Sequence, residues 1–297
     1  NHAQARSENE KSRWQLAEQG SNDGQLMSDL LRALPPAATA AVEVVLVEPI
    51  ASLRAIQQEK LATWADRTSW RPTLAPAHAP GMPVVVICNE LLDAFPVDRV
   101  RIEDGKWRAC RVVVDDTGGF RIVTGPMDDA WSGLLPATTG LPDGYVTEIC
   151  PLLGGWTMDL AAAVPDGLVL VVDYGFEAED YFHPTRVDGT LRTYRAHHAL
   201  DDPFVAIGMS DITAHVNWSH LRTHLESAGF GVTGPLDQGR WLTRVGRDWL
   251  LAQEANPDPA WPKHLRQFQT LTHPQHMGGK FQVVEARPCI GADPREK

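Results

Sequence analysis

Residues 14–26 of the 297-residue chain, WQLAEQGSNDGQL, combine carboxylates and glycines at a spacing that suits a ligand site. Glu18 ends a short apolar stretch, a glycine-bearing turn follows, and leucines then recur at helical spacing. Glycine lets backbone pass close to a ligand, Asn22 is of the residue type next best able to adopt φ > 0, and a helix N-terminus offers free N–H groups. Because the turn carries Glu18 and Asp23 but no lysine or arginine, it favours a ligand with a sulfonium or amino cation and argues against ATP. The predicted ligand positions are Glu18, Gly20, Asn22, Asp23 and Gly24, and an ordinary strand-to-helix turn is the alternative.

A second unit of the same kind follows. Residues 43–47 predict a strand, Glu48 closes it, and residues 51–61 predict a helix. An acid that closes the second strand is what folds that bind dinucleotides or S-adenosylmethionine use to hold ribose hydroxyls. The run MPVVVICNE predicts a buried parallel strand that ends at Asn89 and Glu90, at the carboxyl edge where such sheets bind ligands. Glu48 and Asn89 therefore join the predicted ligand positions.

The elements that must position these residues form an α/β sheet with an insertion. Residues 98–123 alternate apolar and charged side chains around two turns, which predicts a β-meander near the site. Strand and helix order then returns, with a helix predicted at 151–164 and a buried strand that ends in Asp173. Residues 176–210 are rich in Tyr, His, Arg and Asp, which predicts a long binding loop or lid.

The last part of the chain predicts how the sheet closes. Residues 213–229 predict an amphipathic helix, and residues 230–232 with 241–245 predict a closing antiparallel pair. This ending is typical of a class I methyltransferase sheet rather than of a dehydrogenase. Residues 247–291 predict a short helix, a His-rich loop and a strand at 281–285. The expected fold class is α/β, a Rossmann-like class I methyltransferase sheet with an antiparallel closing hairpin and a β-meander insertion.

Length and composition set the domain expectations. We predict a Rossmann-like domain at 1–97 and 144–250, a β-rich insertion at 98–143, and a C-terminal extension at 251–297 packed on the core. The net charge of −11 disfavours nucleic acid as the main partner and is compatible with a basic substrate. Four widely separated cysteines predict reduced, buried thiols, and no apolar run has the length of a membrane span.

Several stretches together carry a family resemblance. The chain resembles the MidA family of S-adenosylmethionine-dependent methyltransferases, whose mitochondrial members modify an arginine of a respiratory complex I subunit. The matching stretches span most of the chain: AEQGSNDGQLMSDLL, VEP, NELLDAFPV, GYVTEI, VVDYG, GTLRTYRAHH, DITAHV and HPQHMGGKFQVV. The family's turn has glycine where this chain has Asn22. A segment that usually precedes the first strand is absent, which leaves part of the family's cofactor and substrate lid unaccounted for.

The resemblance implies S-adenosylmethionine as the cofactor and a protein arginine as the methyl acceptor. Methyl transfer from a sulfonium is an in-line displacement, and the nucleophile must lie about 3 Å from the methyl carbon. A guanidinium is protonated in water, so the site must orient it and accept a proton, and carboxylates do both. Glu90 and Asp93, one helical turn apart, are the candidate catalytic acids, with Asp93 as a helix cap the alternative. His215 is a third catalytic candidate, as a proton acceptor facing the cleft.

Five further residues are candidate substrate contacts: Glu148, Asp173, Tyr194, His197 and Asp211. The acids have structural alternatives, because Glu148 precedes a helix and favours its dipole, Asp173 is placed to cap a turn, and Asp211 is placed to cap the helix predicted at 213–229. Tyr194 and His197 are expected to line a substrate channel or to donate hydrogen bonds. A metal at this His-rich loop is disfavoured because no matching Cys or acid pair lies at ligand spacing.

Other functions stay open. The protein could instead be an assembly factor that binds a partner with a vestigial cofactor site, as Asn22 and the missing front segment suggest. A nicotinamide dehydrogenase is disfavoured by the closing hairpin and the imperfect glycine pattern. The expected partner is a protein with an exposed arginine, with a respiratory complex subunit as the family's example, and a homodimer is a further expectation. The expected location is cytoplasmic for a bacterial chain and the mitochondrial matrix for a eukaryotic one.

Overall fold

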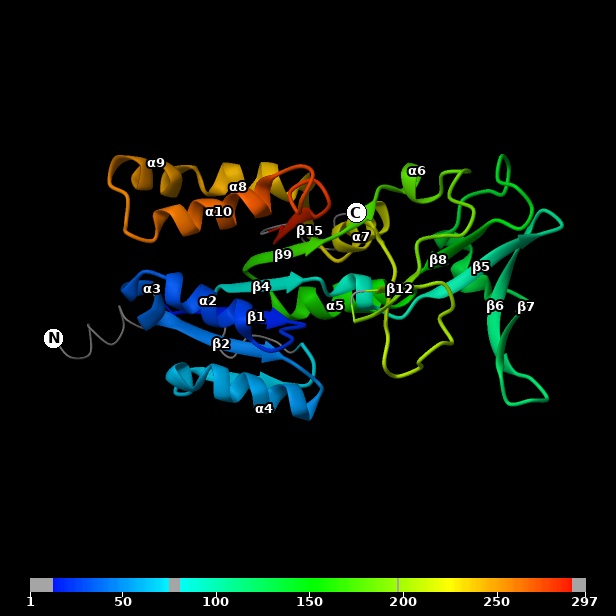
Figure 1. Cartoon of the computed structure of the whole chain (residues 1–297), viewed down its shortest axis with the longest axis horizontal. Helices are drawn as coiled ribbons and strands as arrows, with labels where there is room; N and C mark the ends of the chain where they lie inside the picture. Colours follow the sequence, from blue (N-terminus) through cyan, green and yellow to red (C-terminus); the bar gives the residue numbers. More distant parts are fainter. Residues whose placement is uncertain (1–12, 75–80, 197, 290–297) are drawn as a thin grey trace. The chain divides into compact units, whose positions relative to one another are not determined.

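The computed structural model describes residues 13–74, 81–196 and 198–289, which fall into two compact units (Figure 1). Unit 1 comprises the described residues within Asn1–Leu91, Trp156–Asp173 and Leu225–Lys297, and unit 2 comprises Leu92–Gly155 and Tyr174–His224. The predicted insertion at 98–143 therefore covers only part of unit 2. Unit 2 extends beyond both ends of that range and also includes Tyr174–His224, which follows the strand that ends in Asp173.

Unit 1 is built on one sheet of seven strands among the described residues, in the order β15-β16-β9-β4-β1-β2-β3. The strands are β1 (Trp14–Gln19), β2 (Val42–Val47), β3 (Thr68–Arg71), β4 (Val84–Asn89), β9 (Gly167–Asp173), β15 (Phe230–Asp237) and β16 (Gln282–Pro288). Strands β1, β2, β3, β4 and β9 run parallel, whereas β16 is antiparallel to both β9 and β15. The predicted α/β fold with an antiparallel closure is confirmed.

Apolar runs explain why the central strands lie inside the sheet. Strand β2, VEVVLV, is buried at five of its six positions, as expected for a parallel strand covered on both faces. Helix α2 packs Met27 and Leu31 onto Leu16 and Val44 of the sheet. The register pairs Gln19 with both Val47 and Cys88, so β1, β2 and β4 end together at one edge.

Helices occur in both units among the described residues. They are α2 (Gln25–Ala33), α3 (Pro36–Ala41), α4 (Ala51–Lys60), α5 (Leu152–Ala163), α6 (Ala178–Tyr181), α7 (Trp218–Ser227), α8 (Gln238–Val245), α9 (Arg247–Ala255) and α10 (Trp261–Thr272), with 3₁₀ turns at Ala62–Trp64, Leu92–Ala94 and Asp129–Leu134. Within the described ranges, each helix is too short or too polar to cross a membrane.

Two predictions about the end of the chain are wrong. Residues 241–245 lie in α8 rather than in a strand, and β15 pairs instead with β16, after three helices. The helix predicted at 213–229 begins only at Trp218, because the residues before it form the short strands β13 (Asp211–Thr213) and β14 (Val216–Asn217).

Unit 2 is mostly β-structure. The predicted meander is confirmed as β5 (Asp98–Glu103), β6 (Lys106–Val114) and β7 (Phe120–Gly125), and β8 (Val146–Ile149) joins it in the order β7-β6-β5-β8. The segment 176–210 is not a structureless loop. It contributes β11 (Arg192–Arg195) and β12 (His198–Leu200) to a small sheet with β13, and β10 (Gly175–Phe176) pairs with β14.

Candidate functional site

The turn after β1 has the backbone that its sequence predicts. Gly20, Asn22 and Gly24 adopt φ of 81°, 45° and 79°, so asparagine does take the left-handed conformation expected of it. A Cβ at Gly20 would lie 3.0 Å from Leu91 Cδ1, which leaves little room for a side chain there. The carbonyl of Gly24 accepts the Ser28 N–H at 3.1 Å at the start of α2. The turn therefore exposes backbone at the carboxyl edge of the sheet.

Glu18 is the buried acid of this turn. Its side chain is 3% exposed, and burial raises its pKa from 4.5 to about 7, against a backbone N–H at Met27 that lowers it. Asp23 adds a smaller repulsion that also raises the pKa of Glu18. Among the residues that the structure describes, Glu18 Oε2 has no hydrogen-bond partner. A buried carboxylate oxygen without a donor is suited to a cationic ligand group.

Gln57 of α4 joins the turn to the acid that closes β2. Its Nε2 donates to the Asn22 carbonyl at 2.7 Å and to Glu48 Oε2 at 3.3 Å, while Trp70 Nε1 donates to its Oε1 at 3.0 Å. Glu48 is buried, and its other oxygen accepts the Ile50 N–H at 2.9 Å. Gln57 thus fixes the two predicted ligand-binding elements against each other. Sequence reasoning missed it, because nothing in its spacing marks it out.

Asp23 belongs to the framework of the turn. Its carboxylate pairs with Lys60 and accepts the Gln25 N–H at 3.0 Å, and the Lys60 hydrogen bond is the main reason why its pKa lies below the usual value. These contacts engage both carboxylate oxygens of Asp23.

The ends of β4 and β9 supply polar residues to the same edge of unit 1. Glu90 is exposed, has φ of 48° and donates its backbone N–H to the Val172 carbonyl at 2.9 Å. Asn89 Nδ2 donates to Glu90 Oε1 at 3.3 Å, whereas Asp173 is fully buried. A non-glycine residue with positive φ at a strand end is a backbone strain that is often found at functional sites.

Asp93 and His215 lie together in unit 2, with Tyr174 between them. Tyr174 Oη donates to Asp93 Oδ2 at 2.5 Å, and its ring meets the His215 ring edge-on at 4.9 Å. Burial raises the pKa of Asp93, and the Tyr174 hydrogen bond offsets part of that shift. Sequence reasoning missed Tyr174, because its role depends on contacts made in the folded chain.

His215 is held as a neutral ring. It stacks on Phe176 at 5.0 Å, and the Arg186 guanidinium lies 4.0 Å from the centre of the Phe176 ring. Burial first, then the charges of Arg186 and Arg192, lower the pKa of His215 to about 4. His215 therefore carries no proton charge at neutral pH.

Glu148 has a structural environment. It lies in β8, fully buried, where its Oε1 accepts Arg99 Nε at 3.1 Å and its Oε2 accepts the Thr190 N–H at 2.7 Å and hydroxyl at 3.1 Å. These contacts tie β8 to the segment that follows Gly189, where a Cβ would lie 2.4 Å from Glu148 Oε1. The carboxylate therefore joins β8 to Arg99 of β5 and to Thr190 within unit 2.

The remaining substrate candidates lie on the small sheet of unit 2. Tyr194 of β11 and Asp211 of β13 are register partners, so the structure brings these two together. Asp211 is exposed in a strand, so the alternative that it caps a helix is wrong. His197 lies outside the described residues.

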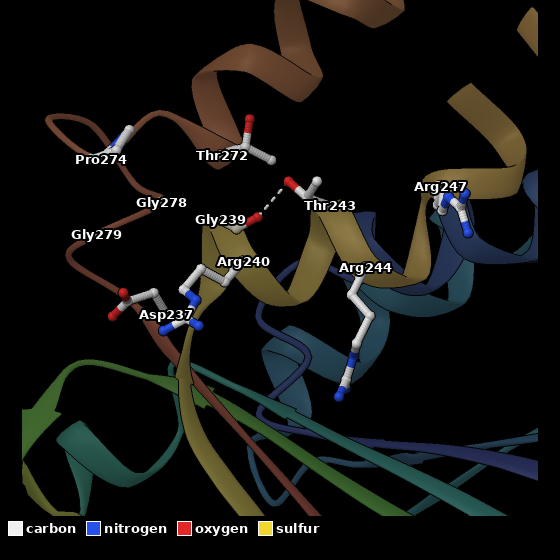
Figure 2. A pocket seen from close by; sticks show the side chains of 10 residues that line it. All are labelled: Asp237, Gly239, Arg240, Thr243, Arg244, Arg247, Thr272, Pro274, Gly278 and Gly279. Atoms are coloured by element: carbon white, nitrogen blue, oxygen red, sulfur yellow. Dashed lines mark hydrogen bonds between the residues drawn. The ribbon is translucent and has the colours of Figure 1, made fainter. Parts of the chain in front are cut away.

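A hollow of about 610 Å³ in unit 1 is lined by none of the predicted site positions. Figure 2 shows the residues that line it. It sits at the start of α8, where Thr243 Oγ1 donates to the Gly239 carbonyl at 2.7 Å and Arg244 pairs with Glu285 at 2.7 Å. The Gly239 N–H donates to the Gly278 carbonyl at 2.9 Å, and a Cβ at either glycine would strike the Thr272 carbonyl. These glycines serve a close backbone crossing rather than a ligand.

Comparison with known proteins points to one family. Residues 2–236 match a family model described as "Putative S-adenosyl-L-methionine-dependent methyltransferase". The chain is 26% identical over 93% of its length to the protein arginine methyltransferase NDUFAF7, mitochondrial, of Mus musculus, and 29% identical over 69% to the homolog of Drosophila melanogaster. It spans 67% of the mouse protein and 47% of the fly protein.

Two solved structures from Burkholderia thailandensis are similar over 95% of the chain. One is 31% identical with a TM-score of 0.80, over 76% of that chain. The other is 30% identical with the same TM-score, over 73% of that chain, and was solved bound to S-adenosyl-homocysteine.

Proposed function

The chain belongs to this family of S-adenosylmethionine-dependent methyltransferases, and from that premise we propose that its methyl acceptor is an arginine of a protein substrate. The cofactor is S-adenosylmethionine. The observation that supports the acceptor is that relatives aligned over 93% of the chain are named protein arginine methyltransferases. The relatives are named mitochondrial, so for a eukaryotic chain we propose the mitochondrial matrix, with a respiratory complex I subunit as the acceptor protein that the family resemblance implies.

The residues of unit 1 fit the cofactor. The unpartnered Glu18 Oε2 suits the cofactor's ammonium group, Gly20 presents backbone without a side chain, and Glu48 is placed to accept the ribose hydroxyls. When bound, the cofactor supplies a methyl group on a sulfonium. Asn22 and Gln57 act by holding the turn and the Glu48 carboxylate in a fixed relation.

Two carboxylates have the properties that an arginine acceptor needs. Glu90 is exposed at the end of β4 and can pair with a guanidinium. Asp93 is buried beside the Tyr174 hydroxyl, and burial raises its pKa, which suits it to accept a proton. His215, neutral and packed on Phe176, serves in this proposal by supporting the Tyr174 ring.

The proposal is tested by mapping where the methyl group goes. Purified protein is incubated with methyl-labelled cofactor and an extract of the source organism, and labelled peptides are identified by mass spectrometry. We expect label on arginine, lost in Glu90→Gln and Asp93→Asn variants that still bind S-adenosyl-homocysteine. Label confined to lysine, to a carboxylate or to small molecules would contradict an arginine acceptor.

A further inference from the structure

Asp93 and Tyr174 of unit 2 are joined through a short stretch of backbone as well as through their side chains. The Ala214 N–H donates to the Asp93 carbonyl at 2.9 Å, and the Val216 N–H donates to the Tyr174 carbonyl at 3.0 Å. Ala214 and Val216 are both buried. Because Tyr174 Oη donates to Asp93 Oδ2 at 2.5 Å, a shift of residues 214–216 moves the donor and the acceptor of that bond.

His215, between these two amides, ties the stretch to a buried threonine. Its N–H donates to Thr190 Oγ1 at 3.1 Å. Thr190 is 1% exposed, and its own N–H and hydroxyl donate to Glu148 Oε2 at 2.7 Å and 3.1 Å. Because a hydroxyl has a single proton, giving it to Glu148 leaves the oxygen lone pairs for the His215 N–H and for the Tyr181 hydroxyl, which lies 3.5 Å away.

Glu148 is fixed in turn from β5. Its Oε1 accepts Arg99 Nε at 3.1 Å, and Arg99 also donates to the Asp188 carbonyl at 3.2 Å. Both carboxylate oxygens of the buried Glu148 are therefore engaged. Buried polar networks whose members all have partners make the part of the fold that they cross rigid. These hydrogen bonds run without a gap from β5 to residues 214–216.

We propose that Thr190, held by Glu148, is a positioning residue that sets the Tyr174 hydroxyl on the Asp93 carboxylate. The step to catalysis rests on the function proposed above, in which Asp93 accepts the proton of the arginine acceptor. In this arrangement Glu148 serves the reaction only through Thr190, and it is not the substrate contact predicted from the sequence.

The acidity of Asp93 reports whether the Tyr174 hydroxyl is in place. Burial raises the pKa of Asp93, and the Tyr174 hydroxyl, then the backbone N–H groups of Ala94 and Asp93, lower it. His215, whose ring meets Tyr174 edge-on, is neutral at neutral pH. A weaker Tyr174 hydrogen bond therefore raises the pKa of Asp93.

NMR titration of the isotope-labelled Asp93 carboxyl carbon in the full chain measures this pKa without a substrate, and Asp93→Asn assigns the signal. Thr190→Ser keeps the hydroxyl, whereas Thr190→Cys puts a weak hydrogen-bond partner at nearly the same size, so the His215 N–H keeps an acceptor. Tyr174→Phe removes the hydrogen bond itself. Thr147→Val is the matched control, because the buried Thr147 Oγ1 has no hydrogen-bond partner among the described residues.

Tyr174→Phe is expected to weaken proton release from Asp93 about tenfold, the size of losing one hydrogen bond to a charged group. Thr190→Cys is expected to act in the same direction by less, while Thr190→Ser and Thr147→Val titrate as the wild type does. In a Tyr174→Phe chain, Thr190→Cys should add nothing, because the bond through which it acts is already gone. The proposal is overturned if Thr190→Cys titrates like Thr190→Ser, if its effect persists in the Tyr174→Phe chain, or if Tyr174→Phe leaves the titration unchanged.

Activity separates the positioning role from the proposed function. Because the ionised Asp93 is the form that accepts a proton, the acid limb of kcat against pH should move to higher pH in Thr190→Cys together with the NMR titration. A general loss of stability would not move that limb. A shifted titration with an unmoved limb supports the positioning of Asp93 by Thr190 and counts against Asp93 as the proton acceptor.

Discussion

Replacing Glu18 by glutamine is expected to remove a pH dependence from cofactor binding. Burial raises the pKa of Glu18 to about 7, so the unliganded protein holds a proton there over most of the acidic range. If the cofactor ammonium lies beside Glu18, as proposed, it favours the ionised carboxylate, and binding releases that proton. With one proton released, affinity should rise about 25-fold between pH 5.5 and pH 7.5 and then level off.

The raised pKa of Glu18 also predicts how Glu18→Gln changes the stability of the unliganded protein, and this effect is opposite in sign to the effect on cofactor binding. A carboxyl whose folded pKa is raised from 4.5 to about 7 stabilises the fold below pH 4.5, and that contribution is lost as the pH rises through 7. The shift corresponds to about 3 kcal/mol. Glu18→Gln keeps the shape of the side chain without the charge. Above pH 7 the unliganded variant should therefore be more stable than the wild type, although it binds the cofactor more weakly.

Isothermal titration calorimetry with S-adenosyl-homocysteine across this pH range measures the affinity, and buffers of different ionisation enthalpy count the released proton. Urea unfolding at the same pH values measures the stability. The reasoning about Glu18 is refuted if the wild type and Glu18→Gln show the same pH profile of affinity, or if the wild-type affinity falls as the pH rises from 5.5 to 7.5.

Three other substitutions test the environments described above. Gln57→Met removes three hydrogen bonds from a buried site, so urea unfolding should show a loss of about 3 kcal/mol, with weaker cofactor binding by calorimetry. Gly189→Ala places a Cβ 2.4 Å from a Glu148 oxygen at φ of 69°, and thermal unfolding should show a loss of about 2 kcal/mol or more, whereas an unchanged melting temperature would contradict that contact. His215, with its pKa lowered to about 4, contributes stability that is present above pH 6.5 and is lost as the pH falls through 4. His215→Phe keeps an aromatic ring on Phe176, and its acid unfolding should be less steep between pH 6.5 and 4 than that of the wild type.

The sequence predicted the parts of the fold that depend on local pattern. Apolar runs that end in acids identified the central strands, and Glu48 became a candidate because it directly follows such a run. The closing pair was mispredicted because residues 241–245 carry apolar side chains that suit a helix as well as a strand, and the true partner of β15 follows only after three helices. A strand that pairs over such a sequence distance leaves no local signal.

Sequence reasoning could name candidate residues at the ends of strands. It passed over residues whose contacts join different elements of the fold. Asn22 adopts the left-handed backbone expected of it, whereas Gln57 and Tyr174 acquire their roles only through contacts made in the folded chain. Asp211 was placed at a helix start because its strand is three residues long and depends on pairing with Tyr194 and its neighbours in β11.

Calorimetric titration of S-adenosyl-homocysteine into the wild type, Glu48→Ala and Arg247→Ala tests the central claim most directly. Arg247 lines the separate hollow at α8 and serves as the control. If the cofactor lies across the ends of β1 and β2, the wild type binds one molecule per chain, Glu48→Ala loses at least about tenfold in affinity, equivalent to about 1.4 kcal/mol, and Arg247→Ala binds as the wild type does. Absence of binding, or a loss in Arg247→Ala with none in Glu48→Ala, would contradict this placement.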